Sequence, residues 1–187
     1  NGIDTDVFYP RDKDAAREKF GFSKEDFIIS FTGHFIDRKG PLRVMKASLD
    51  AGVKAAYAGK GPETPDAENT VWCGPVVPED MPILLSASDV FVLPTRSEGC
   101  CNAIIEALAC GIPVISSNLP FNDDILDEKC SIRINPDDID EISKAIDLLA
   151  NDPERRAMIA AAAYEKGRKL SLSERANRIA SWMENNL

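Results

Sequence analysis

The sequence of 187 residues contains one histidine, His34, and its five cysteines show no C-x-x-C spacing. Structural zinc sites are usually built from closely spaced cysteine and histidine ligands, so we expect no metal ion. An odd number of cysteines that includes the adjacent pair Cys100 and Cys101 also argues against a disulfide framework. A reducing, cytoplasmic setting fits this cysteine usage best.

Long apolar runs are also missing. No stretch approaches the roughly 20 apolar residues that a membrane-spanning helix needs, and no basic-then-apolar leader opens the chain. With 44% hydrophobic residues the chain can bury one core but is short for two, so we expect a single domain over residues 1–187. Because it starts at Asn1 rather than Met, we expect it to be part of a longer protein.

Basic residues are scarce over much of the chain. The formal net charge is −9, and residues 61–128 contain twelve acidic residues but a single basic one, Arg96. Binding to a phosphate backbone needs a basic face, so nucleic acid is excluded as a partner. A bound anion must therefore meet Arg38, Lys39, Lys60 or Arg96, or the N-terminus of a helix.

What the chain does have is a regular alternation of strands and helices. Short apolar runs predict strands at 27–31, 53–58, 71–73, 89–93, 113–116 and 132–134. Longer stretches with helix start and stop signals predict helices at 12–20, 41–50, 78–87, 102–110, 138–150, 153–168 and 172–185. This order predicts an α/β fold with a parallel sheet covered on both faces. The turns at 33–40, 59–62, 75–78, 94–102 and 117–124 should line the edge where such sheets bind ligands.

The segment 93–114 is the most informative, because it runs from strand to loop, helix, glycine stop and strand. Gly99 permits a tight turn and close backbone approach, and Asn102 is predicted to be the N-cap of the helix. The free amides around Cys101 form a site for a phosphate anion. Glu98 lies just before this helix and Glu106 in its second turn, where each carboxylate can accept hydrogen bonds from sugar hydroxyls.

Residues 98–114 are similar to the E-x7-E signature of family 4 retaining glycosyltransferases, in the form E-G-x-x-N-x-x-x-E-A-x-A-C-G-x-P-V. The resemblance covers nearly the whole chain. Residues 1–10 resemble the N-G-x-D…F-x-P opening of the C-terminal domain in these enzymes, 33–40 the loop that holds the donor diphosphate, and 59–62 the G-x-G-P turn. The terminal helices resemble the tail that packs onto the N-terminal domain.

The resemblance implies a Rossmann-like, nucleotide-sugar-binding domain that forms the C-terminal half of a GT-B fold. It implies transfer from a UDP-sugar or GDP-sugar, with retention at the anomeric carbon and without a metal or other cofactor. The acceptor, a glycan or lipid-linked glycan, would be bound by the absent N-terminal domain, where any membrane association would also reside.

The resemblance also implies roles for individual residues. Glu98 would contact hydroxyls of the transferred sugar and Glu106 those of the ribose. Lys39 would neutralise the diphosphate, with Arg38 beside it.

Backbone groups complete the implied donor site. Gly33 opens the diphosphate loop, while amides near Gly99, Cys101 and Asn102 would complete the phosphate cradle. The turn that contains Val76 would border the base.

Two features depart from the family pattern. His34 stands where many members have arginine, and the run 61–70 is too short for the helix that usually follows the G-x-G-P turn. A non-catalytic nucleotide-sugar-binding or regulatory module therefore stays open as an alternative, although the glutamate pair and Lys39 favour an enzyme. An epimerase would need further acid/base groups that a chain with one histidine lacks, and a phosphorylase would need a lysine for pyridoxal phosphate in a different context.

Overall fold

The computed structural model describes residues 2–186, so Asn1, the first residue of the opening motif, and Leu187 lie outside it. Six strands form one sheet in the order β3-β2-β1-β4-β5-β6, and every pairing is parallel. The strands are β1 (Ile28–Thr32), β2 (Lys54–Ala58), β3 (Thr70–Gly74), β4 (Val90–Leu93), β5 (Val114–Ser117) and β6 (Ser131–Ile134). The predicted parallel α/β sheet is confirmed, and each predicted strand end agrees within one residue.

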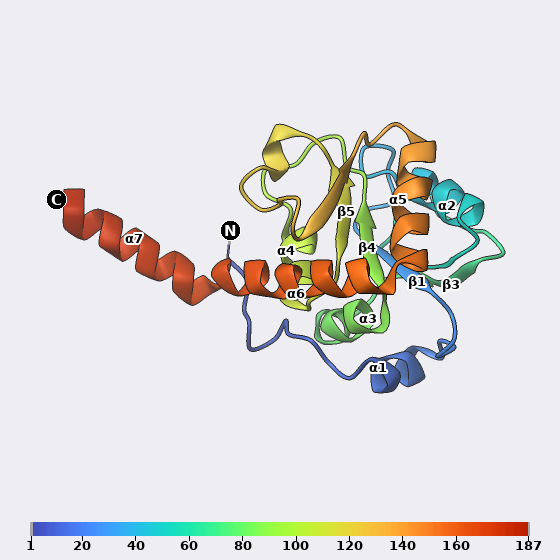
Figure 1. Ribbon diagram of the computed structural model, residues 1–187, viewed down its shortest axis with the longest axis horizontal. Helices are drawn as coiled ribbons and strands as arrows, with labels where there is room; N and C mark the ends of the chain where they lie inside the picture. The colour runs from blue at the N-terminus through green and yellow to red at the C-terminus, as the bar shows by residue number, and fades with distance from the viewer. Residues whose placement is uncertain (1, 187) are drawn as a thin grey trace.

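Helices cover both faces of this sheet (Figure 1). They are α1 (Lys13–Phe20), α2 (Pro41–Asp50), α3 (Met81–Ala87), α4 (Asn102–Ala109), α5 (Ile139–Asn151), α6 (Pro153–Lys169) and α7 (Leu172–Asn186). α2 packs against α5, α4 against α6, and α1 against α3. Because parallel crossovers are right-handed, the strand order places α2 and α5 on one face and α3 and α4, with their partners, on the other.

One predicted helix differs in detail. Residues 78–87 form a short 3-10 turn, Pro78–Asp80, followed by α3. Pro82 lies in the first turn of α3, where its missing N–H has no helical partner to lose. The two prolines therefore divide the segment without interrupting the hydrogen bonds of α3.

The core lies on both faces of the central strands. Consecutive residues Ile28, Ile29 and Ser30 are all buried, which is what a sheet covered on both sides requires. Tyr57 and Phe91 are among the largest fully buried side chains. Complete burial of a side chain of this size stabilises the fold by about 1.5–3 kcal/mol.

A buried ion pair lies at the amino ends of the strands. The guanidinium of Arg17 donates to Asp89 at 2.8 Å, and Asp89 also accepts the Ile28 N–H at 2.7 Å. Arg17 further donates to the carbonyls of Ala87 and Lys24 at 3.1 and 2.6 Å. Arg17 therefore has a structural role, at the edge of the sheet opposite the predicted site.

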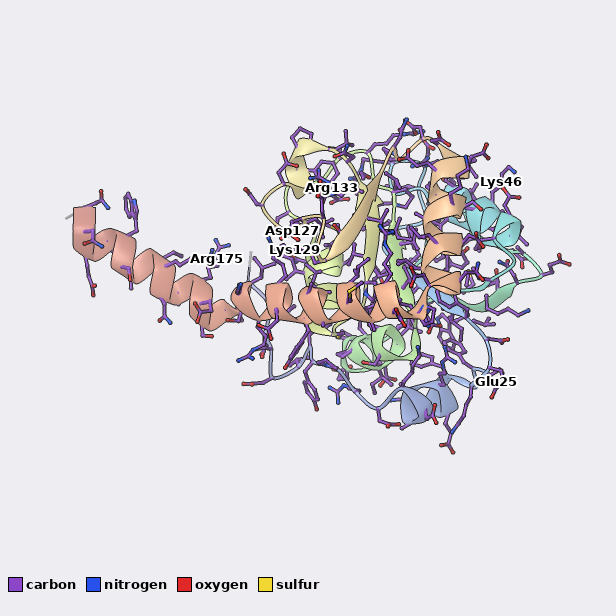
Figure 2. The ribbon with its side chains drawn as sticks, viewed as in Figure 1. Glu25, Lys46, Asp127, Lys129, Arg133 and Arg175 are labelled. Atoms are coloured by element: carbon purple, nitrogen blue, oxygen red, sulfur yellow. The ribbon has the colours of Figure 1, made fainter. Side chains whose placement is uncertain are left out.

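The last helix, α7, projects away from the body of the molecule (Figure 1). Arg175 lies on it, well away from the sheet (Figure 2), and Trp182 is 65% exposed. Its first turn is tied to the start of the chain, because the Leu172 N–H donates to the Ile3 carbonyl at 2.9 Å. Packing of this helix onto an N-terminal domain stays a prediction. Among residues 2–186 no helix has both the length and the apolar character needed to cross a membrane.

Candidate functional site

The predicted site lies where the chain changes direction across the sheet. All strands are parallel, so the loops that follow them meet at one edge, as the sequence predicts. From β1 the chain proceeds outward to β2, whereas from β4 it proceeds to β5 on the other side. The chain therefore reverses its direction across the sheet between these two neighbouring strands, and such a switch point is the usual ligand position in open α/β sheets. Lys39 lies on the first loop and Glu98 on the second.

The carboxylate of Glu98 is the centre of a cluster of donors. One oxygen, Oε1, forms ion pairs with Lys39 Nζ and, at 3.2 Å, with Arg38 Nη1. The same oxygen accepts the Thr95 hydroxyl at 2.9 Å. The side chains of Lys39 and Glu98 are only 15% and 12% exposed. All three of these donors contact Oε1 rather than the second oxygen, Oε2.

Further contacts fasten these two loops together. The Arg96 N–H donates to the Arg38 carbonyl at 2.9 Å, and the Arg38 guanidinium donates to the Ser97 carbonyl. The Arg96 side chain pairs with Asp37 and, at 2.7 Å, with Asp137 in the loop after β6. The hydrogen bond from Arg96 holds the pKa of Asp37 below its ordinary value. These contacts hold Lys39 and Arg38 in a fixed position relative to Glu98.

The turn after β2 packs directly on the first of these loops. A Cβ atom on Gly59 would lie 1.9 Å from the Gly33 carbonyl oxygen, and one on Gly61 would lie 2.4 Å from that of Phe35. The Phe35 N–H donates to the Lys60 carbonyl at 2.9 Å. Both glycines of the G-x-G-P turn are therefore required by close backbone approach. Through this contact, the turn supports the segment that leads to Lys39.

Helix α4 begins at Asn102, and its N-cap residue is Cys101, so the prediction of Asn102 as the N-cap is wrong. The backbone of Cys101 is still extended, which makes it the last non-helical residue. Burial raises the pKa of its thiol to about 11, against the opposing effects of the Ile104 amide and of Lys39. Cys101 thus lies beside the ion pair, at the amino end of α4.

Gly99 differs from the glycines of the G-x-G-P turn. A Cβ atom built on it would meet no atom of the chain within 4 Å. The packing of the protein itself therefore does not require a glycine here. The open space in front of α4 is available for the close approach of a ligand.

Glu106 lies in the second turn of α4 and is half-buried. Burial raises the pKa of its carboxyl above the ordinary value. The ion pair of Lys39 and the hydrogen bond of Thr95 both go to Glu98, so these contacts do not join Glu106 to that cluster.

Replacing Glu106 with glutamine is expected to raise the melting temperature more at about pH 8 than at about pH 4. The folded carboxyl binds its proton more tightly than the unfolded chain does, so the free energy of unfolding falls as the pH rises from 4.5 to the raised pKa. Glutamine has no such proton to lose. Thermal melts at both pH values test this, with exposed Glu68→Gln as control. Equal shifts at the two pH values would contradict the expectation.

Two residues of interest lie outside this cluster. Val76 follows β3, which is two strands from β1, and packs against the smaller apolar cluster that contains Leu84. The structure therefore does not bring it into contact with Lys39 or Glu98. His34, where the family often has arginine, is exposed on the same loop as Lys39.

A separate hollow of about 610 Å³ lies between the segment before α1 and the junction of α6 and α7, where Phe8, Tyr164 and Arg168 line it. None of the predicted site residues lines this hollow. Within residues 2–186 no group of three or more His, Cys, Asp or Glu side chains is arranged to hold a metal ion.

Sequence reasoning missed the partners that organise Glu98. Thr95 and the Ser97 carbonyl are part of the cluster, and Asp37 helps to fix the loops. The signal that could have revealed Thr95 is a hydroxyl residue at the end of a buried strand, three positions before the glutamate.

Comparison with known proteins identifies the class. Residues 12–166 match the family described as Glycosyl transferases group 1, and the match covers most of the chain. The chain therefore belongs to this family.

Individual relatives agree with this assignment. One such relative is the GDP-mannose-dependent monoacylated alpha-(1-6)-phosphatidylinositol monomannoside mannosyltransferase of Corynebacterium glutamicum. It is 28% identical to this chain in an alignment that covers 87% of this chain and 49% of the relative. The chain thus spans about half the length of the curated relatives it matches.

Solved structures show the same fold. The C-terminal domain of the group 1 glycosyl transferase LpcC from Francisella tularensis superposes with a TM-score of 0.81 at 20% identity, covering 91% of this chain and 100% of that one. Anabaena HepE in complex with UDP and glucose gives a TM-score of 0.84 at 18% identity, covering 100% of this chain and 56% of that one. The fold is the Rossmann-like C-terminal half of a GT-B glycosyltransferase.

Proposed function

We propose that this chain is the donor-binding half of a glycosyltransferase that uses a UDP-sugar or GDP-sugar. The enzyme transfers the sugar with retention, and without a metal ion, to a glycan or lipid-linked glycan held by an N-terminal domain. The observation that carries this proposal is the contact of Lys39 and Arg38 with Glu98 at the switch point between β1 and β4. The UDP named with HepE and the GDP-mannose in the name of the corynebacterial relative support the same ligand class.

The arrangement of charges fits a sugar attached directly to a diphosphate. Such a donor places sugar hydroxyls and phosphate oxygens a few ångströms apart. Glu98 supplies an acceptor for the hydroxyls, and Lys39 and Arg38 supply positive charge for the phosphates. An acceptor in direct contact with two cations matches that pairing of groups.

In the reaction, the bond between the anomeric carbon and the diphosphate oxygen breaks. A bond to the acceptor oxygen forms on the same face of the sugar, and the acceptor hydroxyl gives up its proton. The main demand is to stabilise charge on the leaving diphosphate. Lys39, Arg38 and the positive end of the α4 helix dipole meet it with groups that are already oriented.

The remaining residues complete the proposed donor site. Gly99 lets the phosphates approach the amides near Cys101 and Asn102, and Glu106 accepts from the ribose hydroxyls. The turn at Val76 borders the base. We propose a cytoplasmic setting, with any membrane association made by the N-terminal half; the free cysteines agree with a reducing compartment.

Titration calorimetry of the 187-residue chain with UDP and GDP, in buffer containing EDTA, tests this proposal. We expect one of the two nucleotides to bind, with a dissociation constant of about 1 µM to 1 mM, and we expect the same affinity when Mg²⁺ replaces EDTA. The absence of both heat and thermal shift with either nucleotide would rule out the donor-binding role. Binding without any transfer by the two-domain protein would instead favour the non-catalytic module.

A further inference from the structure

Thr95 connects the sheet to the donor site. It lies two residues after the end of β4, is completely buried, and precedes Glu98 by three residues. Its carbonyl accepts a hydrogen bond from the buried hydroxyl of Ser117, at the end of the neighbouring strand β5. Its position is therefore fixed by the sheet rather than by the exposed loop that follows.

The hydroxyl of Thr95 has one proton and two possible acceptors. Glu98 Oε1 lies at 2.9 Å and the Ser97 carbonyl at 3.3 Å. The carboxylate is both the nearer and the stronger acceptor, because hydrogen bonds to ionised groups are shorter and stronger. Thr95 therefore holds the carboxylate of Glu98.

The other two donors to Oε1 are the cations Lys39 and Arg38. The diphosphate of the proposed ligand would compete with Glu98 for both of them. A diphosphate attracts Lys39 and Arg38 away from Glu98, since it offers several anionic oxygens in place of one. A neutral, buried hydroxyl has no comparable attraction to an anion that arrives from solvent. Thr95 is therefore the donor that remains on Oε1 after the cations have turned to the phosphates.

The two oxygens of Glu98 thus have different surroundings. The contacts from Thr95, Lys39 and Arg38 are all made to Oε1. A carboxylate anchored through one oxygen presents the other in a fixed direction. That second oxygen, Oε2, suits a sugar hydroxyl, which donates one proton.

We propose that Thr95 is a positioning residue that anchors Glu98 through Oε1 and so directs Oε2 to a hydroxyl of the donor sugar. This inference rests on the proposed function, because it concerns the sugar half of the same site. Thr95 itself touches neither the sugar nor the diphosphate. Its substitution should therefore alter recognition of the sugar and leave recognition of the nucleoside diphosphate intact.

The test compares Thr95→Val, which keeps the shape but loses the hydroxyl, with Thr95→Ser, which keeps the hydroxyl. In the two-domain enzyme, Thr95→Val is expected to lower kcat/KM by about 10- to 100-fold, the range for loss of a hydrogen bond to a charged group. Thr95→Ser is expected to stay near wild type. In calorimetry of the 187-residue chain, Thr95→Val is expected to weaken the nucleotide sugar but to bind the nucleoside diphosphate as wild type does.

A double-mutant cycle with Glu98→Gln shows whether Thr95 acts through Glu98. If it does, adding Thr95→Val to Glu98→Gln causes little further loss of kcat/KM. If Thr95→Val fails to fold, the pair Thr95→Ser and Thr95→Ala replaces it, because these two variants differ only in the hydroxyl.

Three results would overturn the inference. The first is a wild-type kcat/KM in Thr95→Val, and the second is a loss of kcat/KM in Thr95→Ser equal to that in Thr95→Val. The third is that Thr95→Val weakens binding of the nucleoside diphosphate as much as binding of the nucleotide sugar. The proposed function has a separate failure, which is a wild-type chain that binds neither UDP nor GDP. The two failures are therefore distinguishable, since the first three results presuppose a wild-type protein that binds its donor.

Discussion

Replacing Glu98 with glutamine is expected to lower kcat/KM of the two-domain enzyme by about 10²- to 10³-fold, the usual effect of removing one preorganised polar group from a reacting centre. The same substitution is expected to leave the affinity for UDP or GDP unchanged or slightly higher. Both follow from the contacts of the carboxylate: it is the proposed acceptor for the sugar, and it also occupies Lys39 and Arg38. Glutamine removes the negative charge and frees both cations for the diphosphate.

Steady-state kinetics of transfer and calorimetry with the nucleoside diphosphate measure the two effects separately. Glu68→Gln makes the same chemical change at an exposed position and is expected to alter neither quantity. A Glu98→Gln enzyme with wild-type transfer would remove this residue from the site. A variant that lost nucleotide affinity would instead show that Glu98 mainly holds the loops together.

Replacing Lys39 with alanine is expected to weaken UDP or GDP binding by about 10- to 100-fold, as expected for loss of a charged hydrogen bond. The physical reason is the pairing seen in the structure. Without Lys39, Glu98 Oε1 still accepts from the more exposed Arg38 and the neutral Thr95. Its negative charge would then face the incoming diphosphate with less compensation.

Calorimetry of the 187-residue chain measures this affinity directly. Lys60→Ala is the matched control, because it removes the same charge from an exposed position on the neighbouring loop. It is expected to bind close to wild type. Equal losses in the two variants would mean that only general electrostatics matters, and full affinity in Lys39→Ala would exclude Lys39 from the phosphate site.

Much of the fold could be predicted because its four inner strands, β2, β1, β4 and β5, are largely buried on both faces. Such strands are nearly continuous apolar runs, as in 90–93, and their ends are easy to place. Strand order was not predicted, since it depends on which helices pack together across the sheet. The adjacency of β1 and β4, which creates the switch point, became visible only in the structure.

The site was predicted only in part, because part of it depends on the strand order. Glu98 and Lys39 were found from local motifs, and their positions on two separate loops followed from those motifs. Their mutual contact and the role of Thr95 depend on β1 lying beside β4, so no local pattern revealed them. The N-cap at Asn102 was wrong because residue preference alone did not show that the extended backbone ends at Cys101.

The charges of this chain act on its ligand over two length scales. The formal net charge is −9, while Lys39 and Arg38 gather positive charge at one point of the surface. The net charge of this chain would therefore repel the proposed anionic donor at a distance, and the two cations would attract it at close range. Salt screens interactions beyond about 8 Å at physiological strength, so it weakens the distant repulsion more than the close contacts. The rate at which the donor arrives and the time for which it stays bound are thus set by different charges.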